Sequence, residues 1–335
     1  MKARRVAAFL VLCVAVVAAV AGYVRFVQQR VPQQSANATV PAPIGASQTI
    51  FFRHNGNDAH YGQLARVRPG ADSARKFLST LNCEVVHVAG QRGLCLVADR
   101  GVLTTYAARI FDLSDQRVLW ELPLAGIPSR CRVATDGRRA ALTVFVSGHG
   151  YDNVDFSTQT LLIDLQTGQV ESDLDKFVVL KDGVRFQARD FNFWGVSFER
   201  DSRYFYATLS TGGQHYLVRG DAVQRSATVV RPGVECPSLS PDGTRIAFKK
   251  RATEPGPVHW SVAVFELASG RETALAERNS VDDQLEWLDA GHVLYSMPAG
   301  EGGSSSTTDV WVAPADGRGT PERLLSGAYS PAVAR

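Results

Sequence analysis

The chain has 335 residues, of which 45% are hydrophobic and 21% are charged, close to ordinary globular usage. This composition excludes wholesale disorder, a collagen and a dense disulfide scaffold. Basic residues number 36 and acidic residues 33, and five of the basic residues lie in the first 30 positions, which hold no acid. The rest of the chain is nearly neutral and has no basic stripe, so the sequence argues against nucleic-acid binding.

The amino terminus begins with three basic residues and continues as an uncharged apolar run over residues 6–24. About 20 apolar residues span a bilayer as a helix. Two interpretations stay open for residues 1–27: a signal peptide cleaved after Ala21, or an uncleaved membrane anchor helix, which the length of the run favours. The basic residues keep that end in the cytoplasm. We therefore expect a single-pass protein with an extracytoplasmic carboxy-terminal domain, or a secreted or periplasmic protein if cleavage occurs.

Residues 28–47 are rich in Gln, Pro, Ser and Asn and contain few large apolar residues. Such a composition cannot bury enough surface to fold, so we expect a flexible tether. From residue 48 onward, short alternating apolar runs are separated by Gly, Asp, Asn and Pro. This pattern predicts an all-β domain over residues 48–335.

The clearest repeat opens at residues 238–248, with the sequence SLSPDGTRIAF. A short strand meets Asp242-Gly243 and a second strand follows at once, and Asp-Gly between apolar runs is a strong hairpin signal because both residues tolerate positive φ. A third strand near 262–268 and a fourth at 272–275 complete a four-stranded meander.

Copies of this unit are marked by four turn aspartates, Asp136, Asp201, Asp242 and Asp289, which are 65, 41 and 47 residues apart. A period in the forties with four strands per unit indicates a β-propeller blade. The widest gap predicts an insertion at about residues 173–190. We expect each turn aspartate to hydrogen-bond its own backbone.

Six blades follow from these units. Residues 49–53 and 61–67 look like the second and third strands of a blade without a first strand, while residues 328–335 look like a first strand. We expect the carboxy-terminal strand to complete the amino-terminal blade, because this pairs two edges that would otherwise stay open. The other five blades begin near residues 82, 130, 194, 235 and 283. The predicted fold is an all-β six-bladed propeller with four-stranded antiparallel blades, preceded by one hydrophobic helix.

The repeat at 238–248, together with DVWV at 309–312 and the later Asp316-Gly317, resembles the propeller repeats of TolB-like proteins. The resemblance covers about residues 48–335. TolB proteins carry a separate α/β domain before the propeller, in the place where this sequence has the tether. The resemblance implies an extracytoplasmic, non-catalytic interaction module, and it does not extend to the Tol–Pal partners.

Motifs for catalysis or for a cofactor are missing from the sequence. The seven histidines are scattered, and no His-x-x-x-His, Cys-x-x-Cys or Gly-x-Ser-x-Gly pattern occurs. We therefore expect no catalytic residue, no metal site, no cofactor and no enzymatic activity.

The starts of the innermost strands line the mouth of the axial channel in a propeller, on the face that also carries the loops between second and third strands. The polar and aromatic residues at these starts are our candidates for partner or ligand binding: Arg130, Trp194, Glu235, Asp282, Asp283 and Gln284. The loops on this face, at 54–61, 147–158, 252–259 and 298–308, are long for hairpin connections. Long loops on a rigid scaffold often form a binding surface.

Four cysteines lie outside the amino-terminal helix, at positions 83, 95, 131 and 236. An even number in an oxidising compartment suggests disulfides, and Cys83 with Cys95 in one hairpin is the preferred pair. This pair requires a bend or a bulge, because the direct cross-strand neighbour of Cys95 lies nearer His87. For Cys131 and Cys236 we expect buried free thiols.

These observations predict a monomeric bacterial propeller that binds one or more envelope proteins as a scaffold and contacts the membrane through its amino-terminal helix. The alternative is a propeller that binds a glycan or small ligand, with or without hydrolysis. It would use the channel mouth, with charged groups from Arg130, Glu235, Asp282 and Asp283 and with Trp194 as a stacking platform. A purely structural spacer is the third interpretation.

Overall fold

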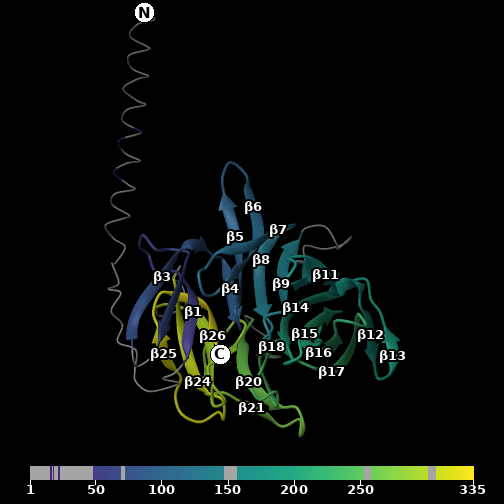
Figure 1. The fold of residues 1–335 in the computed structure, drawn as a ribbon. Coiled ribbons are helices and arrows are strands. Elements are labelled where there is room, and N and C mark those ends of the chain that lie inside the picture. Colours follow the sequence, from purple (N-terminus) through teal and green to yellow (C-terminus); the bar gives the residue numbers. More distant parts are fainter. Residues whose placement is uncertain are drawn as a thin grey trace, which may run out of the picture.

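The computed structural model describes residues 48–68, 72–146, 157–252, 258–300 and 307–335, and the isolated positions Val16, Ala18 and Gly22. These ranges form six β-sheets arranged as the blades of a propeller (Figure 1). The expected tether, and the amino-terminal helix apart from those three positions, lie outside the described residues. Within the described part of the chain, no helix has the length and apolar character needed to cross a bilayer.

Blades 1 to 3 each contain four strands, which follow one another in space from the innermost to the outermost. Blade 1 consists of β26 (Ala328–Ala334), β1 (Thr49–His54), β2 (Gln63–Arg68) and β3 (Asp72–Asn82). Blade 2 consists of β4 (Val85–Ala89), β5 (Arg92–Arg100), β6 (Thr104–Asp112) and β7 (Val118–Leu124). Blade 3 consists of β8 (Ile127–Val133), β9 (Arg139–Val146), β10 (Ser157–Asp164) and β11 (Val170–Asp173).

Blades 4 to 6 follow in the same order. Blade 4 begins with β14 (Asn192–Phe198), β15 (Tyr204–Thr211), β16 (Gln214–Asp221) and β17 (Ser226–Pro232). Blade 5 consists of β18 (Glu235–Leu239), β19 (Arg245–Arg251), β20 (Trp260–Glu266) and β21 (Glu272–Ala274). Blade 6 consists of β22 (Glu286–Trp287), β23 (His292–Pro298), β24 (Thr308–Pro314) and β25 (Glu322–Leu325). The six blades and their starting positions confirm the prediction.

The ring closes through the carboxy-terminal strand, as the sequence predicted. β26 pairs antiparallel with β1, with Thr49 opposite Ala334 and His54 opposite Ala328. Inner strands contact one another around the ring, from β26 through β4, β8, β14, β18 and β22, and β22 contacts β26 again. The Ser330 hydroxyl also donates to the carbonyl of Val86 at 2.8 Å, which joins blade 1 to blade 2.

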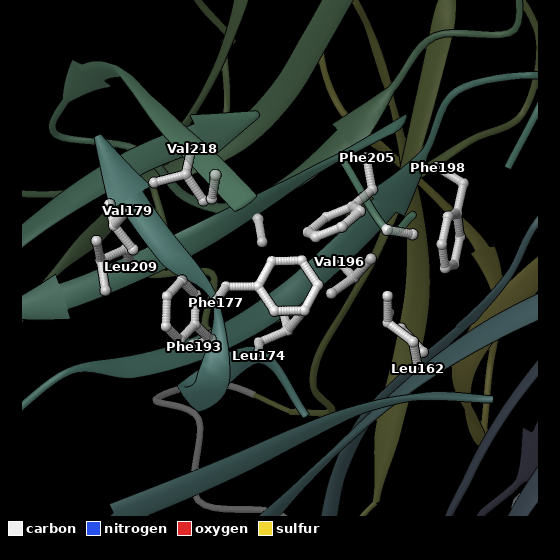
Figure 2. Packing of buried hydrophobic residues seen from close by; sticks show 14 of the residues in the cluster. Leu162, Leu174, Phe177, Val179, Phe193, Val196, Phe198, Phe205, Leu209 and Val218 are labelled. Carbon is white, nitrogen blue, oxygen red and sulfur yellow. The ribbon is translucent and has the colours of Figure 1, made fainter. Parts of the chain in front are cut away.

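Blade 4 departs from the expected four strands, because the insertion at 173–190 adds to its outer edge. The inserted chain forms a 3-10 turn (Leu174–Lys176) and the hairpin of β12 (Val178–Lys181) and β13 (Val184–Phe186). β12 pairs in parallel with β17, so this blade has six strands and is not wholly antiparallel. Buried side chains of the insertion, such as Phe177, pack among the aromatic residues of blade 4 (Figure 2).

The turn aspartates have the predicted structural role. In the turns between first and second strands, the Asp136, Asp201 and Asp242 carboxylates each accept the backbone N–H two residues onward, at 2.9–3.1 Å. The glycines at 137 and 243 have φ of 66° and 75°, which is the left-handed region that favours glycine. These short-range bonds fix the hairpins from local sequence alone.

The disulfide joins Cys83 and Cys95, whose Cα atoms are 5.3 Å apart. The register places Val86, rather than His87, opposite Cys95. The chain bends at Glu84, between β3 and β4, directly after Cys83. Cys131 and Cys236 are free and buried, and burial raises the pKa of Cys131 to about 12. Such a thiol is unreactive at neutral pH.

Removal of residues 328–335 should destabilise the whole ring rather than one blade. The truncation removes the β26–β1 ladder and the burial of Ala328, Ala332 and Val333. Several backbone hydrogen bonds at about 1 kcal/mol each, plus this apolar burial, amount to roughly 5 kcal/mol or more. We expect a single cooperative melt at a temperature lower by about 10 °C or more, measured by circular dichroism. A melt unchanged from that of the intact chain would contradict closure by β26.

Candidate functional site

Four of the inner strands, β8, β14, β18 and β26, carry a β-bulge, and in three of them the bulge contains a residue with positive φ. The residues are Gly195 in β14 (φ 64°), Cys236 in β18 (φ 49°) and Ser330 in β26 (φ 53°). A bulge bends its strand and re-aims the adjacent side chain. The residue before each bulged position, Trp194 in β14 for example, lies at the channel mouth.

A network of charges occupies this mouth. Lys249 of β19, whose side chain is 5% exposed, forms an ion pair with Asp282, and its Nζ lies 3.9 Å from Glu235 Oε2. Arg130 of β8 lies 3.9 Å from the same Asp282 carboxylate. Arg130 of blade 3 and Lys249 of blade 5 thus both contact Asp282, which links these two blades across the channel mouth.

An aromatic group flanks this network on the side of blades 4 and 5. The Trp260 indole N–H donates to Glu235 Oε1 at 3.3 Å, and the Lys249 ammonium lies 4.5 Å from the centre of the same indole ring. His215 Nδ1 lies 3.2 Å from Glu235 Oε1, and its ring meets the half-buried Trp194 edge-on at 5.5 Å. Glu235 therefore lies in reach of Lys249, Trp260 and His215, and His215 in turn contacts Trp194.

Asp283 and Gln284 fix the wall formed by blade 6. Asp283 is 4% exposed and accepts the backbone N–H groups of Ser296 and Gln284, both at 2.8 Å. The Gln284 amide crosses the channel and donates to the carbonyl of Val196 in blade 4 at 3.1 Å. Both side chains therefore fix the position of the chain before β22 at the channel mouth.

Burial and neighbouring charges shift the pKa values of several groups at the channel mouth. Burial raises the pKa of Asp283, although Arg130 and the two N–H donors oppose the shift. Burial also lowers the pKa of His215, against the attraction of Glu235. For Lys249, burial works against the charge, but Cys236 and Asp282 outweigh it and the pKa is raised. Lys249 is therefore charged at neutral pH.

The structure brings the predicted mouth residues together around one channel end. Arg130 lies close to Asp282, and Glu235 lies close to Lys249, which pairs with Asp282. Trp194 and Gln284 lie around these charges. Sequence reasoning missed Lys249, Trp260 and His215, which come from second and third strands. Glu235 lies directly opposite Lys249 only because of the bulge in β18. The loop segments 147–156, 253–257 and 301–306 of this face lie outside the described residues.

A second charge cluster lies at the other end of the channel. Arg132 is 7% exposed, and its guanidinium donates to the Glu286 carboxylate and to the Leu285 carbonyl. His87 Nε2 lies 3.5 Å from Glu286 Oε2, and Arg335 Nη1 lies 3.6 Å from Glu286 Oε1. These residues belong to blades 1, 2, 3 and 6, so the cluster ties four blades together across the axis.

The protonation states in this second cluster follow from burial and from Arg132. Burial lowers the pKa of His87 and Arg132 lowers it further, so the ring is neutral. The Val133 N–H donates to His87 Nδ1 at 3.1 Å, which requires that this nitrogen carry no proton. Burial opposes ionisation of Glu286, but Arg132 and His87 outweigh it and lower its pKa to about 2.

Within the described residues, no group of three or more His, Cys, Asp or Glu side chains is placed to hold a metal ion. No family model and no curated protein matches the chain. Among solved structures, it is similar to TolB from Acinetobacter baumannii, with 18% identity, a TM-score of 0.59, and 88% of this chain and 68% of that chain covered. It is also similar to a putative TolB from Agrobacterium tumefaciens, with 12% identity, a TM-score of 0.50 and coverage of 84% and 90%.

The chain is a TolB-like propeller in fold. The resemblance seen in the repeats is thereby confirmed at the level of architecture. A hydrazine synthase from Kuenenia stuttgartiensis also matches, with 14% identity, a TM-score of 0.46 and coverage of 83% and 79%, a likeness too weak to carry an argument. What this TolB-like propeller binds has to be argued from its own surface.

Substitution of Gly195 by alanine should destabilise the mouth. Gly195 has φ of 64°, and a Cβ atom there would lie 2.7 Å from the Cα of Cys236 in the next blade. We expect a loss of about 2–4 kcal/mol in the free energy of unfolding, from backbone strain plus the clash, measured in urea. Gly213→Ala is the matched control, because its φ is 71° with no atom within 4 Å of the added carbon. Equal losses in the two variants would contradict a close contact between the blades.

The neutral state of His87 predicts a pH dependence of stability. The unfolded chain binds a proton at His87 near pH 6.5, whereas the folded state resists it, so stability falls as pH drops below that value. Between pH 7.5 and 5.5 this difference amounts to about 1 kcal/mol. His87→Asn keeps an acceptor for the Val133 N–H and should flatten this part of the curve of unfolding free energy against pH. An NMR signal that is absent from the spectrum of His87→Asn, and so belongs to His87, would refute the neutral state if it titrated near pH 6.5.

Proposed function

We propose that this TolB-like propeller is a non-catalytic scaffold that binds another protein at the cell envelope through its loop face. The loop face is the end of the ring where inner strands start and second strands end. The apolar side chains exposed there are the observation that carries the proposal.

The described part of the loop face exposes six large apolar side chains: Tyr61, Val102, Leu103, Ile127, Phe145 and Val258. Val102 and Leu103 are 105% and 82% exposed at the tip of the β5–β6 hairpin, which projects beyond the neighbouring blades (Figure 1). Ile127 and Phe145 lie opposite each other on β8 and β9. Exposed apolar side chains with polar groups among them are typical of protein-binding surfaces.

The channel mouth at the centre of this face also favours a protein partner. Its charges are paired with one another, and the hollow beside Arg130 and Asp283 has a volume of about 20 Å³, which holds about one water molecule. The side chain of Asp282 remains 55% exposed and Trp194 is half-buried. Both can therefore meet a surface laid over the mouth without entering the channel.

An extracytoplasmic location is part of the proposal. The apolar run at 6–24 supports export, either as an anchor or as a signal peptide. The Cys83–Cys95 disulfide supports it independently, because disulfides persist in oxidising compartments. The likeness in fold to TolB structures is consistent with such a location.

The test is crosslinking capture from an envelope extract of the source organism, with the full chain as bait. The variant carries Val102→Ser, Leu103→Ser and Ile127→Ser, which removes apolar area from the loop face without touching buried contacts. We expect the native chain to capture a specific protein and the variant to lose at least about tenfold in yield, because the apolar area of these three side chains would be buried on binding at roughly 25 cal/mol per Å².

The matched control carries Val184→Ser and Val223→Ser, which are 69% and 66% exposed but lie on the outer hairpin and the outer turn of blade 4. It should capture the partner as well as the native chain does. Equal loss in both variants, or retention by the loop-face variant, would contradict the proposed face.

A further inference from the structure

The hairpin of β5 and β6 ends in a tip whose large side chains are not packed in the fold. Residues 101–103 connect the two strands, and Val102 and Leu103 are more exposed than any other large apolar side chain of the described residues. Turns are usually built from Gly, Asn, Asp, Ser or Pro, because these residues suit the backbone of a turn or bond to it. A valine and a leucine at a tip therefore indicate a role outside the fold.

Blade 4 shows that the same connection can be made without an apolar side chain. Its second and third strands, β15 and β16, are joined by Gly212 and Gly213, whose φ values are 55° and 71°. Positive φ at both central residues is what a tight hairpin turn requires, and glycine adopts it at no steric cost. Such a turn offers no side chain to a partner. The apolar tip of blade 2 is thus not needed to close a hairpin of this propeller.

The tip stands on a hairpin that is held firmly in place. The β5–β6 ladder runs through nine residue pairs and ends with Arg100 opposite Thr104, directly below the tip. Arg100 Nη1 lies 2.6 Å from Glu84 Oε1, and Arg53 Nη2 of blade 1 lies 3.7 Å from Glu84 Oε2. These contacts connect the upper part of the hairpin to the neighbouring blade. Little conformational freedom is therefore lost when the tip binds, which favours affinity.

The shape of the tip fits a hollow better than a flat surface. The hairpin projects beyond the neighbouring blades as a narrow finger (Figure 1). A flat surface would cover one side of the two apolar side chains and leave the other side in water. A pocket would surround both side chains, and full burial of a valine or leucine is worth about tenfold or more in affinity for each.

The charges below the tip favour a protein pocket over a lipid surface. Asp99 is exposed, two residues before the tip, and has no ion-pair partner among the residues that the structure describes. Arg100, which could attract anionic lipid, is already paired with Glu84. Binding to a lipid surface depends on buried apolar area together with cations near anionic headgroups. A basic residue at the rim of a protein pocket, by contrast, would pair with Asp99.

We propose that the tip of the β5–β6 hairpin inserts into an apolar pocket of the partner protein, and that a basic residue at the rim of this pocket contacts Asp99. The inference rests on the proposed function, because it names the kind of partner that the loop face binds. Val102 and Leu103 are then the main anchors. Ile127 and Phe145, which lie on strands of blade 3, are secondary contacts.

The first test places a photo-crosslinking residue at the tip of the full chain, as Leu103→p-benzoylphenylalanine, and irradiates it in an envelope extract. We expect an adduct with the protein that the native chain captures, and mass spectrometry should map the crosslink to apolar residues that line a pocket of that protein. Val223→p-benzoylphenylalanine, in the outer turn of blade 4, is the matched control and should not give this adduct. An adduct with phospholipid, or a crosslink to a flat polar surface, would overturn the proposal.

The second test separates the tip from the rest of the loop face by titrating the purified captured protein with full-chain variants. Val102→Ser with Leu103→Ser should weaken binding by at least about tenfold, and Ile127→Ser alone by less than about threefold. Asp99→Asn should cost about twofold to fivefold, the range of an exposed ion pair, and should reduce the salt dependence of binding.

The outcomes distinguish this inference from the proposed function. Unchanged binding of the variant with two serines at the tip, or an equal loss in Ile127→Ser, would refute insertion of the tip and leave the scaffold role standing. Failure of the native chain to capture any protein would refute the proposed function, and the inference with it.

Discussion

The rest of the structure depends on the closure of the ring by β26. A propeller has no single central core, since each blade packs only on its two neighbours, so an open ring would expose two blade faces at once. β26 prevents this by pairing with β1 and by contacting β4, β22 and β23 as well. Its Ser330 hydroxyl binds Val86 of blade 2, and its neighbour Arg335 binds the Trp287 carbonyl of blade 6. One strand therefore joins three blades.

The channel adds a second constraint, which is electrostatic. Charges buried at both ends cost desolvation energy, and a buried pair is often no more stabilising than packed apolar residues. What such pairs supply is position, because a wrong register leaves a buried charge unpaired. The Arg132–Glu286 pair joins residues 154 positions apart, and Lys249 with Asp282 joins residues 33 apart. We infer that these pairs hold the blades at one fixed rotation about the axis, which the apolar clusters between blades specify less sharply.

Local sequence determines the hairpins well, and for that reason the six blades could be predicted. The Asp-Gly turns act through bonds to the next two residues, so they need no tertiary information. The bulges were not predictable in the same way. Without the bulge in β18, the register set by Leu239 opposite Ile246 would place Lys250, not Lys249, opposite Glu235. The parallel pairing of β12 with β17 and the charge cluster around Arg132 likewise depend on residues far apart in the chain.

The two ends of the channel differ in how freely they can change. The loop face includes connections outside the ladders, and its most exposed apolar residues, Val102 and Leu103, lie at the tip of a hairpin beyond its last strand pair. At the opposite end, a cleft of about 750 Å³ is lined by residues at the first hairpin turns of blades 3, 4 and 5 and by Arg335, which follows directly on the closing strand. A change in the cleft therefore risks the ring itself, whereas a change in the loop face does not.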